Sequence, residues 1–493
     1  MASSFHVENF GCRAARADGE AMAAMLRSAG MLEGEHADAD VVVVNTCSVT
    51  GEADREARAF IRRANRLNPN ARIIATGCYA QRAPEELAAL PGVAAVVGNS
   101  HKALAPDVAL QMVHGGISSS HSHSSLISLQ SLIAAGKTTD HALILADDTF
   151  AHSFLEEAPV LPGLQTRPNL KIQEGCGNKC SFCVIPQTRG SSRSLPASSV
   201  LRHVESFVAA GGNELVLSGI NLGRWGRDLD ARESTRSLAV LVRRIFAETS
   251  LLRLRLSSIE PMDWDRDLIA VMREFGGSRL ARHAHLPLQS GSDAVLRRMY
   301  RRYRPWHYAE KVAALFNAAG PELTLGADVM VGFPGETDCE FTETLELIRA
   351  LPFGYLHLFP FSPRPGTYAW QLHAESPVPP GLIEARMTVL RALAAEKTRA
   401  HRLQFLSCEL DAITLHTPHA VMAAGRTAAL TENFLPVELE GALPANRPVR
   451  VHVTEMNARG SLAATPAPSE TSAPNRWCDL TRMPFAATLD RGI

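Results

Sequence analysis

The sequence has little that would direct it into a membrane or a secretory pathway. It lacks an apolar run of 18 residues, so no membrane-spanning helix is expected. Its first residues, MASSFHVENFGC, do not combine a basic region with an apolar run, which predicts no signal peptide. An excess of positive charge is also missing, because 50 Lys and Arg face 51 Asp and Glu. We therefore expect a cytoplasmic protein without a membrane partner, in which any nucleic-acid-binding surface is a local patch.

The pattern of a disulfide framework is missing as well. Of the nine cysteines, six fall into two sets of three that look like metal ligands, which fits a reducing cytosol. The other three match no ligand motif and are interpreted as structural or incidental: Cys339, Cys408 and Cys478. With 493 residues, 46% of them hydrophobic, the chain is long enough for about two to four domains with ample cores.

The most informative stretch is KIQEGCGNKCSFCVIPQTRGSSRS, which holds Cys176, Cys180 and Cys183 in a C-x3-C-x2-C pattern. Three thiolates this close can lie on one loop and face one metal cluster. A cubane iron–sulfur cluster has four iron corners and usually takes thiolate ligands, so three cysteines leave one iron open. The alternative is a structural zinc loop or free buried thiols, but zinc sites usually pair two C-x2-C knuckles, and no fourth ligand lies nearby. The spacing therefore predicts an iron–sulfur cluster.

The first 110 residues alternate short strands and helices, and three of the predicted strands are each followed by a cysteine. These strands lie near residues 6–10, 41–44 and 73–74, and the cysteines are Cys12, Cys47 and Cys78. In an open parallel sheet, the carboxyl ends of strands meet at one edge. The three thiols are therefore expected to converge on a second cluster, and the alternative is that they are ordinary buried cysteines.

The remaining pattern predicts an α/β protein with a small β domain at its end. Strand and helix alternate over residues 166–375, as in a βα barrel whose chemistry lies at the strand carboxyl ends. A connecting helix is predicted over 376–404, short β segments over 405–458 and a disordered tail over 459–493. Residues 111–165 are interpreted as a linker or insertion, where His121 and His123 belong to a flexible His/Ser tract rather than a metal site.

The phrases NTCSVT and TGCYAQ, together with the Cys176–Cys183 stretch, resemble the methylthiotransferase family of radical S-adenosylmethionine (SAM) enzymes. The resemblance implies an N-terminal domain with an auxiliary 4Fe-4S cluster, a partial (β/α)6 barrel with a second 4Fe-4S cluster, and a TRAM-like RNA-binding β-barrel. The second cluster would bind SAM at its open iron and cleave it to a 5′-deoxyadenosyl radical, which makes its three cysteines catalytic. After Cys12 the chain reads RAARAD where the family has an Asn and a Glu, so different hydrogen bonds are expected in this loop.

Two further sets of residues follow from the resemblance and from the strand-end motifs. SAM contacts are predicted, against the alternative of ordinary βα turns, at Gly212, Glu214, Ser258, Gln289, Ser290, Asp328 and Gly332. Contacts to tRNA are predicted, against the alternative of a solvated helix end, at Arg189, Arg193, Arg298, Arg301, Arg302 and Tyr303. Arginine pairs with phosphate, and both residue types stack on bases.

Several phrases, among them LSGINLGRWGRDL and LHLFPFSPRPGT, look like one branch of the family. That branch adds a methylthio group to C2 of N6-threonylcarbamoyladenosine at position 37 of tRNA. The alternatives are the branch that acts on N6-isopentenyladenosine 37 and, in a different class, a non-catalytic tRNA-binding iron–sulfur protein. The implied partners are tRNA and an electron donor such as flavodoxin or ferredoxin, and the protein is expected to be a monomer.

Overall fold

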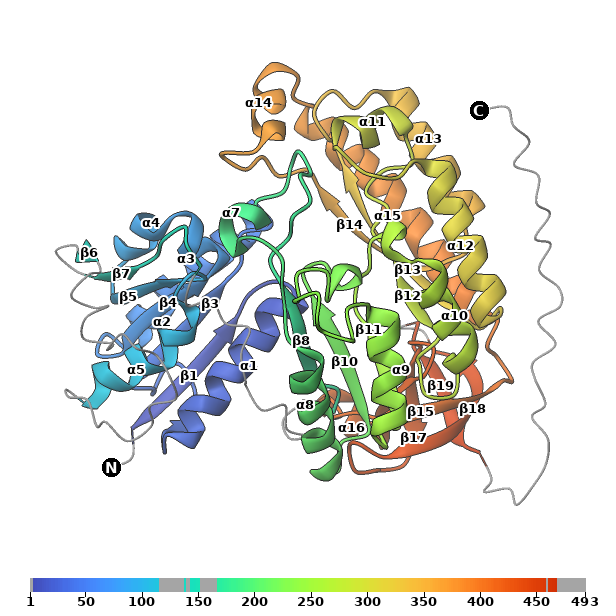
Figure 1. The fold of residues 1–493 in the computed structure, drawn as a ribbon, viewed down its shortest axis with the longest axis horizontal. Helices are drawn as coiled ribbons and strands as arrows, with labels where there is room; N and C mark the ends of the chain where they lie inside the picture. Colours follow the sequence, from blue (N-terminus) through green and yellow to red (C-terminus); the bar gives the residue numbers. More distant parts are fainter. Residues whose placement is uncertain (1–2, 115–136, 139–141, 151–165, 458–459, 468–493) are drawn as a thin grey trace.

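The computed structural model describes residues 3–114, 137–138, 142–150, 166–457 and 460–467. Most of the predicted insertion, including His121 and His123, lies outside these residues, as do Cys478 and most of the predicted tail. Figure 1 shows an N-terminal α/β domain beside a central βα barrel, with a small β-barrel below the latter. Among the helices that are described, none has the length and apolar content required to cross a membrane.

The N-terminal domain is built on a sheet with strand order β2-β1-β3-β4-β5-β7-β6, parallel except for the β6–β7 pair. The strands are β1 (Ser4–Asn9), β2 (Leu32–Glu33), β3 (Val41–Thr46), β4 (Arg72–Gly77), β5 (Val93–Gly98), β6 (Lys137–Thr138) and β7 (Leu143–Leu145). The helices are α1 (Arg13–Ser28), α2 (Gly51–Leu67), α3 (Cys78–Arg82), α4 (Pro84–Ala88) and α5 (Ala105–His114). In β3, Val41 and Val43 enter one core while Val42 and Val44 enter the other, since side chains alternate across a strand. This sheet is therefore covered on both faces, as expected for a parallel sheet.

The central barrel consists of two sheets, ordered β11-β10-β8-β9 and β12-β13-β14, which are joined by a bridge between Leu254 and Leu280. Its strands are β8 (Asn169–Glu174), β9 (Arg193–Ser194), β10 (Glu214–Gly219), β11 (Arg253–Leu256), β12 (His283–His285), β13 (Thr324–Val331) and β14 (Phe353–Pro360). Its helices are α7 (Ile185–Arg189), α8 (Ala197–Ala209), α9 (Leu238–Glu248), α10 (Arg266–Phe275), α11 (Asp293–Arg298), α12 (Pro305–Ala319), α13 (Asp338–Ala350), α14 (Tyr368–Glu375) and α15 (Pro380–Leu403).

The two faces of the barrel strands carry different side chains. Leu325, Ala327 and Val329 of β13 pack into the core formed with the surrounding helices. Because side chains alternate along a strand, Asp328 faces the opposite side, which is the lumen of the barrel. The lumen wall of β12, β13 and β14 is therefore polar, whereas the outer wall is apolar.

The C-terminal domain is a closed barrel with strand order β15-β16-β17-β19-β18, which confirms the predicted small β-barrel. Its strands are β15 (Glu409–Thr414), β16 (Arg426–Thr431), β17 (Pro436–Glu440), β18 (Pro448–Met456) and β19 (Leu462–Pro466), with the short helix α16 (His419–Met422) between the first two. β19 lies beyond the predicted domain end at residue 458, because it must pair with both β17 and β18 to close the barrel. Cys408 is buried in this core.

The C-terminal barrel is attached to the amino ends of the central strands. Arg255 donates to the Glu214 carboxylate at 3.0 Å and to the Thr431 carbonyl at 3.3 Å. Arg282 makes a second ion pair, 2.6 Å from Glu432. The opposite edge of the central barrel, where its strands end, is therefore left for the site described next.

Candidate iron–sulfur and substrate site

The loop after β8 brings Cys176, Cys180 and Cys183 together. It begins at Gly175, where φ is +70° and an added Cβ would lie 2.0 Å from the Ser191 carbonyl oxygen, so only glycine fits. The loop is held by the Cys176 amide, which donates to Gly190 at 3.1 Å, and by the Cys183 amide, which donates to Cys180 at 3.2 Å. Burial, together with the neighbouring Cys180 and Cys176 thiolates, raises the pKa of Cys183 to about 12. Three thiols thus share one confined space.

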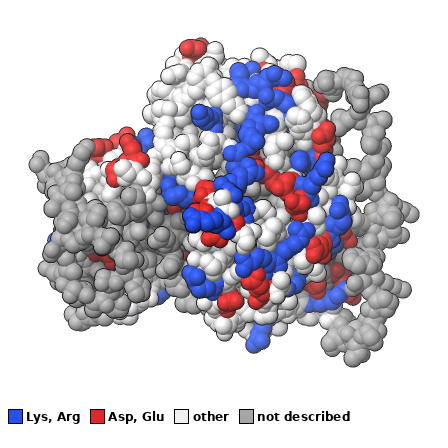
Figure 2. All heavy atoms as spheres, in the orientation of Figure 1, with Lys and Arg blue, Asp and Glu red and all other residues white. Residues whose placement is uncertain are grey.

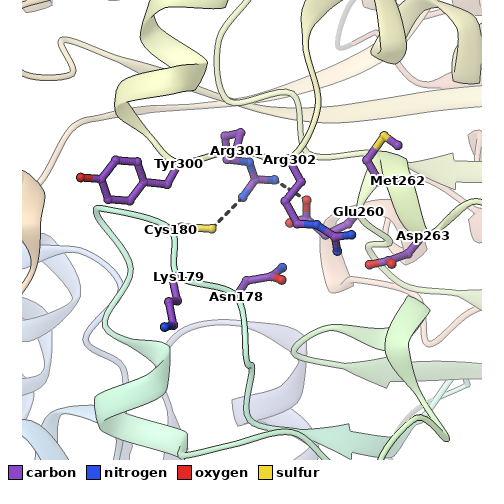
Figure 3. Close-up of a pocket in the computed structure, with 9 residues that line it drawn as sticks. All are labelled: Asn178, Lys179, Cys180, Glu260, Met262, Asp263, Tyr300, Arg301 and Arg302. Atoms are coloured by element: carbon purple, nitrogen blue, oxygen red, sulfur yellow. Dashed lines mark hydrogen bonds and ion pairs between the residues drawn. The ribbon is translucent and has the colours of Figure 1, made fainter.

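Nitrogen donors surround the sulfur atoms of this loop. The Arg301 guanidinium donates to Cys180 Sγ at 3.3 Å, the Asn178 amide to Cys176 Sγ at 3.4 Å, and the Asn221 side chain to the same atom at 3.6 Å. Figure 3 shows Arg301 between Cys180 and Glu260, with contacts to both. Charge-assisted donors of this kind stabilise sulfur that carries negative charge. These donors suit sulfur that carries negative charge, although burial raises the pKa of Cys176 and of Cys183.

A small, partly open hollow lies beside Cys180 (Figure 3). It is lined by Asn178, Lys179, Cys180, Glu260, Met262, Asp263, Tyr300, Arg301 and Arg302. Tyr300, which is 51% exposed, stacks on Tyr368 with ring centroids 5.4 Å apart. The rim of the hollow thus combines exposed cations with exposed aromatic rings.

The second cysteine set lies where β1, β3 and β4 end, and these strands are neighbours in the sheet. Gly11 packs so closely on Cys47 that an added Cβ would lie 2.5 Å from its Sγ, and its φ is +102°. Burial and the nearby Cys78 and Cys12 thiolates raise the pKa of Cys47 to about 12. The three thiols therefore converge although they are far apart in the sequence. The helix α1 begins at Arg13, directly after Cys12.

Cys78 has a different environment from Cys47. Arg189 Nε lies 3.3 Å from its Sγ, and Asn99 Nδ2 lies 3.4 Å from the same atom. Burial alone would raise the pKa of Cys78, but the positive charges of Arg189 and Lys102 outweigh it, so that the pKa is lowered. Cys78 is thus better prepared than Cys47 to be a thiolate.

Three of the six predicted tRNA contacts lie inside the protein, and this part of the prediction is corrected. Arg189 is fully buried between Asp18 and Glu174, and Arg298 pairs with Glu340 at 2.8 Å. Arg301 and Tyr303 are also buried. The Tyr303 hydroxyl donates to the carbonyls of Pro287 and Leu288, which follow β12. Spacing in RMYRRYR could not reveal which side chains turn inwards. Arg302 is exposed, and Arg193 and Arg298 are partly exposed, so these three remain at the surface.

The predicted SAM contacts divide into two groups. Ser258 follows β11, Gln289 follows β12, and Asp328 and Gly332 lie in and after β13, all towards the edge that carries Cys176. Gln289 is held at φ +64° by hydrogen bonds to the neighbouring strand, where its amide donates to Asp328 and its carbonyl accepts from Met330. Ser290 lies nearby, but its hydroxyl is bonded to Thr344 of α13 at 3.1 Å. These positions remain candidates for SAM contact, Ser290 through its backbone.

Gly212 and Glu214 are not brought to this edge, which corrects their predicted role. Glu214 begins β10, so it lies about 16 Å along the strand from Gly219 at the carboxyl end. Its carboxylate is fully buried beneath Arg255 and Arg253, at the junction with the C-terminal barrel. The turn at the other end of β10 instead supplies Asn221, whose amide donates to Gln173 at 2.7 Å and whose side chain contacts Cys176. Sequence reasoning missed Asn221, although its place just after a predicted strand was a usable signal.

The sequence analysis also missed a cluster of polar side chains on the lumen wall, of which it named only Asp328. His285 Nε2 lies 3.1 Å from one Asp328 oxygen, and His357 Nδ1 lies 3.2 Å from the other. The Tyr355 hydroxyl links the other nitrogen of His285, at 3.0 Å, to His283, at 2.8 Å. Two imidazoles and a carboxylate are a donor set that could hold a divalent cation. The signal was the alternation in HAH and YLH, which places residues two apart on one face.

Comparisons with known proteins agree with this layout. Residues 4–98 match the family described as Uncharacterized protein family UPF0004, and residues 170–348 match the Radical SAM superfamily. A Bacillus subtilis protein named threonylcarbamoyladenosine tRNA methylthiotransferase MtaB is 33% identical over 89% of this chain and 90% of its own length. A Novosphingobium aromaticivorans protein named tRNA-2-methylthio-N(6)-dimethylallyladenosine synthase is 34% identical over 79% of this chain and 81% of its own.

Among solved structures, the radical SAM methyltransferase TsrM from Kitasatospora setae, with cobalamin and a [4Fe-4S] cluster bound, has a similar fold. Its TM-score is 0.52 at 15% identity, with 75% of this chain and 77% of that chain covered. The partial barrel and the cysteine loop after its first strand define a radical SAM enzyme. More particularly, the chain belongs to the radical SAM methylthiotransferase family.

The cofactors of this enzyme are SAM and two 4Fe-4S clusters, and the residues present fit them. Each site offers three thiols, so cysteine would bind three of the four irons of a cubane cluster and leave the fourth iron open. Each also aims an arginine at a cysteine sulfur: Arg301 at Cys180 and Arg189 at Cys78. Cationic hydrogen-bond donors are the outer partners expected around a thiolate-bound cluster.

Proposed function

We propose that this enzyme adds a methylthio group to C2 of N6-threonylcarbamoyladenosine at position 37 of tRNA. The observation that carries the proposal is the match along nearly the whole chain to relatives that bear this name, from Bacillus subtilis and Aquifex aeolicus, at 33% and 32% identity. When bound, the clusters and SAM supply the sulfur, the methyl group and the radical chemistry that activates a C–H bond. The residues around them bind, orient and enclose the reacting base.

The polar lumen favours this nucleoside over N6-isopentenyladenosine. The threonylcarbamoyl group carries a hydroxyl, a carboxylate and amide nitrogens, whereas an isopentenyl group is wholly apolar. His285, Asp328 and His357 line the wall below the strand ends. A polar substituent can add hydrogen bonds to this wall, whereas an apolar substituent would cover its polar groups without adding any. The chemistry of the wall therefore supports the polar substrate.

The surface beside the Cys180 hollow supports tRNA as the partner. Figure 2 shows Lys and Arg gathered in a band over the central barrel, although the chain as a whole has a net charge of −1. Lys179 and Arg302 are exposed at the hollow, next to the Tyr300–Tyr368 pair. Cations hold phosphates and aromatic rings stack on unpaired bases, which suits an anticodon loop. The C-terminal β-barrel is proposed as a second RNA contact, and a flavodoxin or ferredoxin as the electron donor to a monomeric, cytoplasmic enzyme.

An anaerobic assay tests the proposal. Reconstituted enzyme would be incubated with SAM, a reductant and tRNA from cells that lack the modification, and the nucleosides would be separated by mass spectrometry. We expect the methylthio derivative of N6-threonylcarbamoyladenosine. If only N6-isopentenyladenosine were methylthiolated, the enzyme would belong to the other branch of the family. Binding of tRNA without consumption of SAM would instead support the non-catalytic alternative.

An iron count on the same preparations tests the division into two clusters. About eight irons are expected in the wild type and about four after Cys12, Cys47 and Cys78 are all replaced by Ala, as two three-thiolate cubane sites predict. About four irons in both proteins would mean that the N-terminal cysteines are not ligands.

A further inference from the structure

One side chain contacts elements of both cysteine sites. Arg189 ends α7, which begins two residues after Cys183. Its guanidinium is fully buried and reaches Cys78 Sγ with Nε, at 3.3 Å. Nη1 and Nη2 donate to Asp18 of α1, both at 3.2 Å, and Nη1 also donates to Glu174, which precedes Cys176 by two residues. Arg189 thus connects the loop of one cluster with a ligand of the other.

The carboxylates around Arg189 are shared with other cations. Lys102 Nζ lies 2.7 Å from the same Asp18 oxygen that Arg189 contacts, and Lys171 lies 3.2 Å from Glu174. The negative charge of Asp18 is therefore shared among several cations, so Asp18 does not by itself neutralise the charge of Arg189. The Nε side of the guanidinium faces the sulfur of Cys78 instead of a carboxylate oxygen. Positive charge buried at this position is stabilised by negative charge on that sulfur.

The contact geometry is enforced from both domains. Asn99, after β5, donates to Cys78 Sγ at 3.4 Å and to the carbonyl of Thr188 at 2.7 Å. The second bond holds the last turn of α7 against the N-terminal domain, so Arg189 cannot easily move away from Cys78. In Figure 1, α7 lies between the N-terminal domain and the central barrel.

From these contacts we propose that Arg189 is a positioning residue that raises the reduction potential of the cluster held by Cys12, Cys47 and Cys78. Reduction adds one negative charge to the cluster. A buried cation that donates a hydrogen bond to a ligand sulfur stabilises the reduced form more than the oxidised form. The same side chain links this electronic effect to the loop that carries Cys176. The inference rests on the two clusters of the family and not on which nucleoside is modified.

The test is a redox titration in which only the auxiliary cluster is present. The full-length chain with Cys176, Cys180 and Cys183 replaced by Ala would be loaded anaerobically, and its reduced cluster followed by electron paramagnetic resonance. Adding Arg189→Gln should lower the fraction of reduced cluster several-fold at the original midpoint potential. Arg189→Lys keeps the charge but loses the planar donor, so its midpoint should fall between the two. An unchanged midpoint in Arg189→Gln overturns the proposal.

Arg364→Gln is the matched control. Arg364 is also buried and also bridges the two domains, since it lies 2.7 Å from Asp54 of α2. Its side chain donates to Asp54 and Ser362 and not to a cysteine. An equal shift in Arg364→Gln would mean that loosening the domain interface alone changes the potential, and the proposal would fail. Iron loss in Arg189→Gln but not in Arg189→Lys supports the role of the charge, whereas equal iron loss in both overturns it.

Discussion

At the scale of the residue, the six cluster cysteines differ in how the fold prepares them. Cys183 and Cys47 are crowded by other thiols and buried, which raises the pKa of each to about 12. Cys78 is equally enclosed, but two cations lower its pKa. Since the ligand form of cysteine is the thiolate, iron must displace a proton from Cys183 and Cys47, whereas Cys78 is ready to bind. Loading of the N-terminal site is therefore expected to begin at Cys78.

Single cysteine substitutions should separate the two halves of the reaction. Cys176→Ala removes a ligand of the cluster that binds SAM, so both SAM cleavage and product should disappear. Cys47→Ala removes a ligand of the auxiliary cluster only, so SAM cleavage should continue without methylthiolated nucleoside. Chromatography of 5′-deoxyadenosine and of tRNA nucleosides measures both quantities. Cys339→Ala, at an exposed position, is the control. Methylthio product from Cys47→Ala would contradict this division.

A buried histidine makes the stability of the fold depend on pH. Burial, aided by Arg402, lowers the pKa of His401 from 6.5 to about 4, and its Nε2 is bonded to the Thr324 hydroxyl at 2.8 Å. The unfolded chain therefore binds a proton near pH 5.5 that the folded chain excludes. This contribution to stability is complete above pH 6.5 and is lost as the pH falls towards 4. Between pH 7.5 and 5.5 the loss should be about 1 kcal/mol.

Denaturant titrations at the two pH values check this effect. His401→Gln keeps a hydrogen-bonding group but does not titrate, so the variant should lose about 1 kcal/mol less than the wild type over the same interval. Equal losses in both proteins would show that His401 does not carry the pH dependence.

At the scale of the element, the two ends of the barrel strands serve different purposes. The carboxyl ends carry the cysteine loop, Asn221 and Gln289, which surround the reaction site. The amino ends carry ion pairs that attach the C-terminal barrel, through Glu214 and Glu432. This division follows from a parallel barrel, in which all strands present the same end to the same side.

The position of Glu214 gives a test of that division. Burial would raise the pKa of Glu214, but Arg255, Arg167 and Arg253 lower it, so the carboxylate is charged and paired. Glu214→Gln leaves these arginines buried with less compensation and should destabilise the protein by about 3 kcal/mol. The Kd for SAM, measured by calorimetry on folded protein, should not change. If the variant bound SAM more weakly while its free energy of unfolding stayed the same, Glu214 would belong to the SAM site after all.

At the scale of the whole molecule, the three domains are joined so that both cysteine sites open near one another. The N-terminal domain is docked on the barrel through Arg364–Asp54 and through Arg189–Asp18, two buried ion pairs with partners from each side. Breaking a buried pair leaves an uncompensated charge, so these contacts resist separation of the domains. Sulfur and radical chemistry can then meet at one bound base.

Binding of tRNA should depend on the exposed cations beside the Cys180 hollow. Lys179→Ala and Arg302→Ala should each weaken binding and reduce the slope of log K against log salt concentration by about one, because a phosphate contact is lost. Filter binding at several salt concentrations measures the slope. Arg391→Ala on α15, which is 55% exposed and paired with Glu384, is the control. If the wild type and all three variants gave the same salt dependence, the tRNA would bind at another surface than the one beside the Cys180 hollow.

The alternation of strands and helices along the chain, the two cysteine sets and the small C-terminal barrel could be predicted from the sequence alone. Hydrophobic alternation and the turn after each strand are local properties, and a C-x3-C-x2-C loop is too short to place its thiols far apart. Convergence of Cys12, Cys47 and Cys78 also followed, because adjacent parallel strands end at one edge.

The tertiary structure alone decided which way individual polar side chains point. RMYRRYR contains four arginines that look equivalent in sequence, yet Arg301 turns inwards to a cysteine while Arg302 stays exposed. Glu214 resembled a site residue until the direction of β10 placed it at the opposite end of the barrel. Arg189 joins Cys78 to Asp18 and Glu174, partners that are 15 to 171 positions away in the chain. Such contacts depend on how whole domains dock, because a charged side chain is buried only where distant residues compensate it.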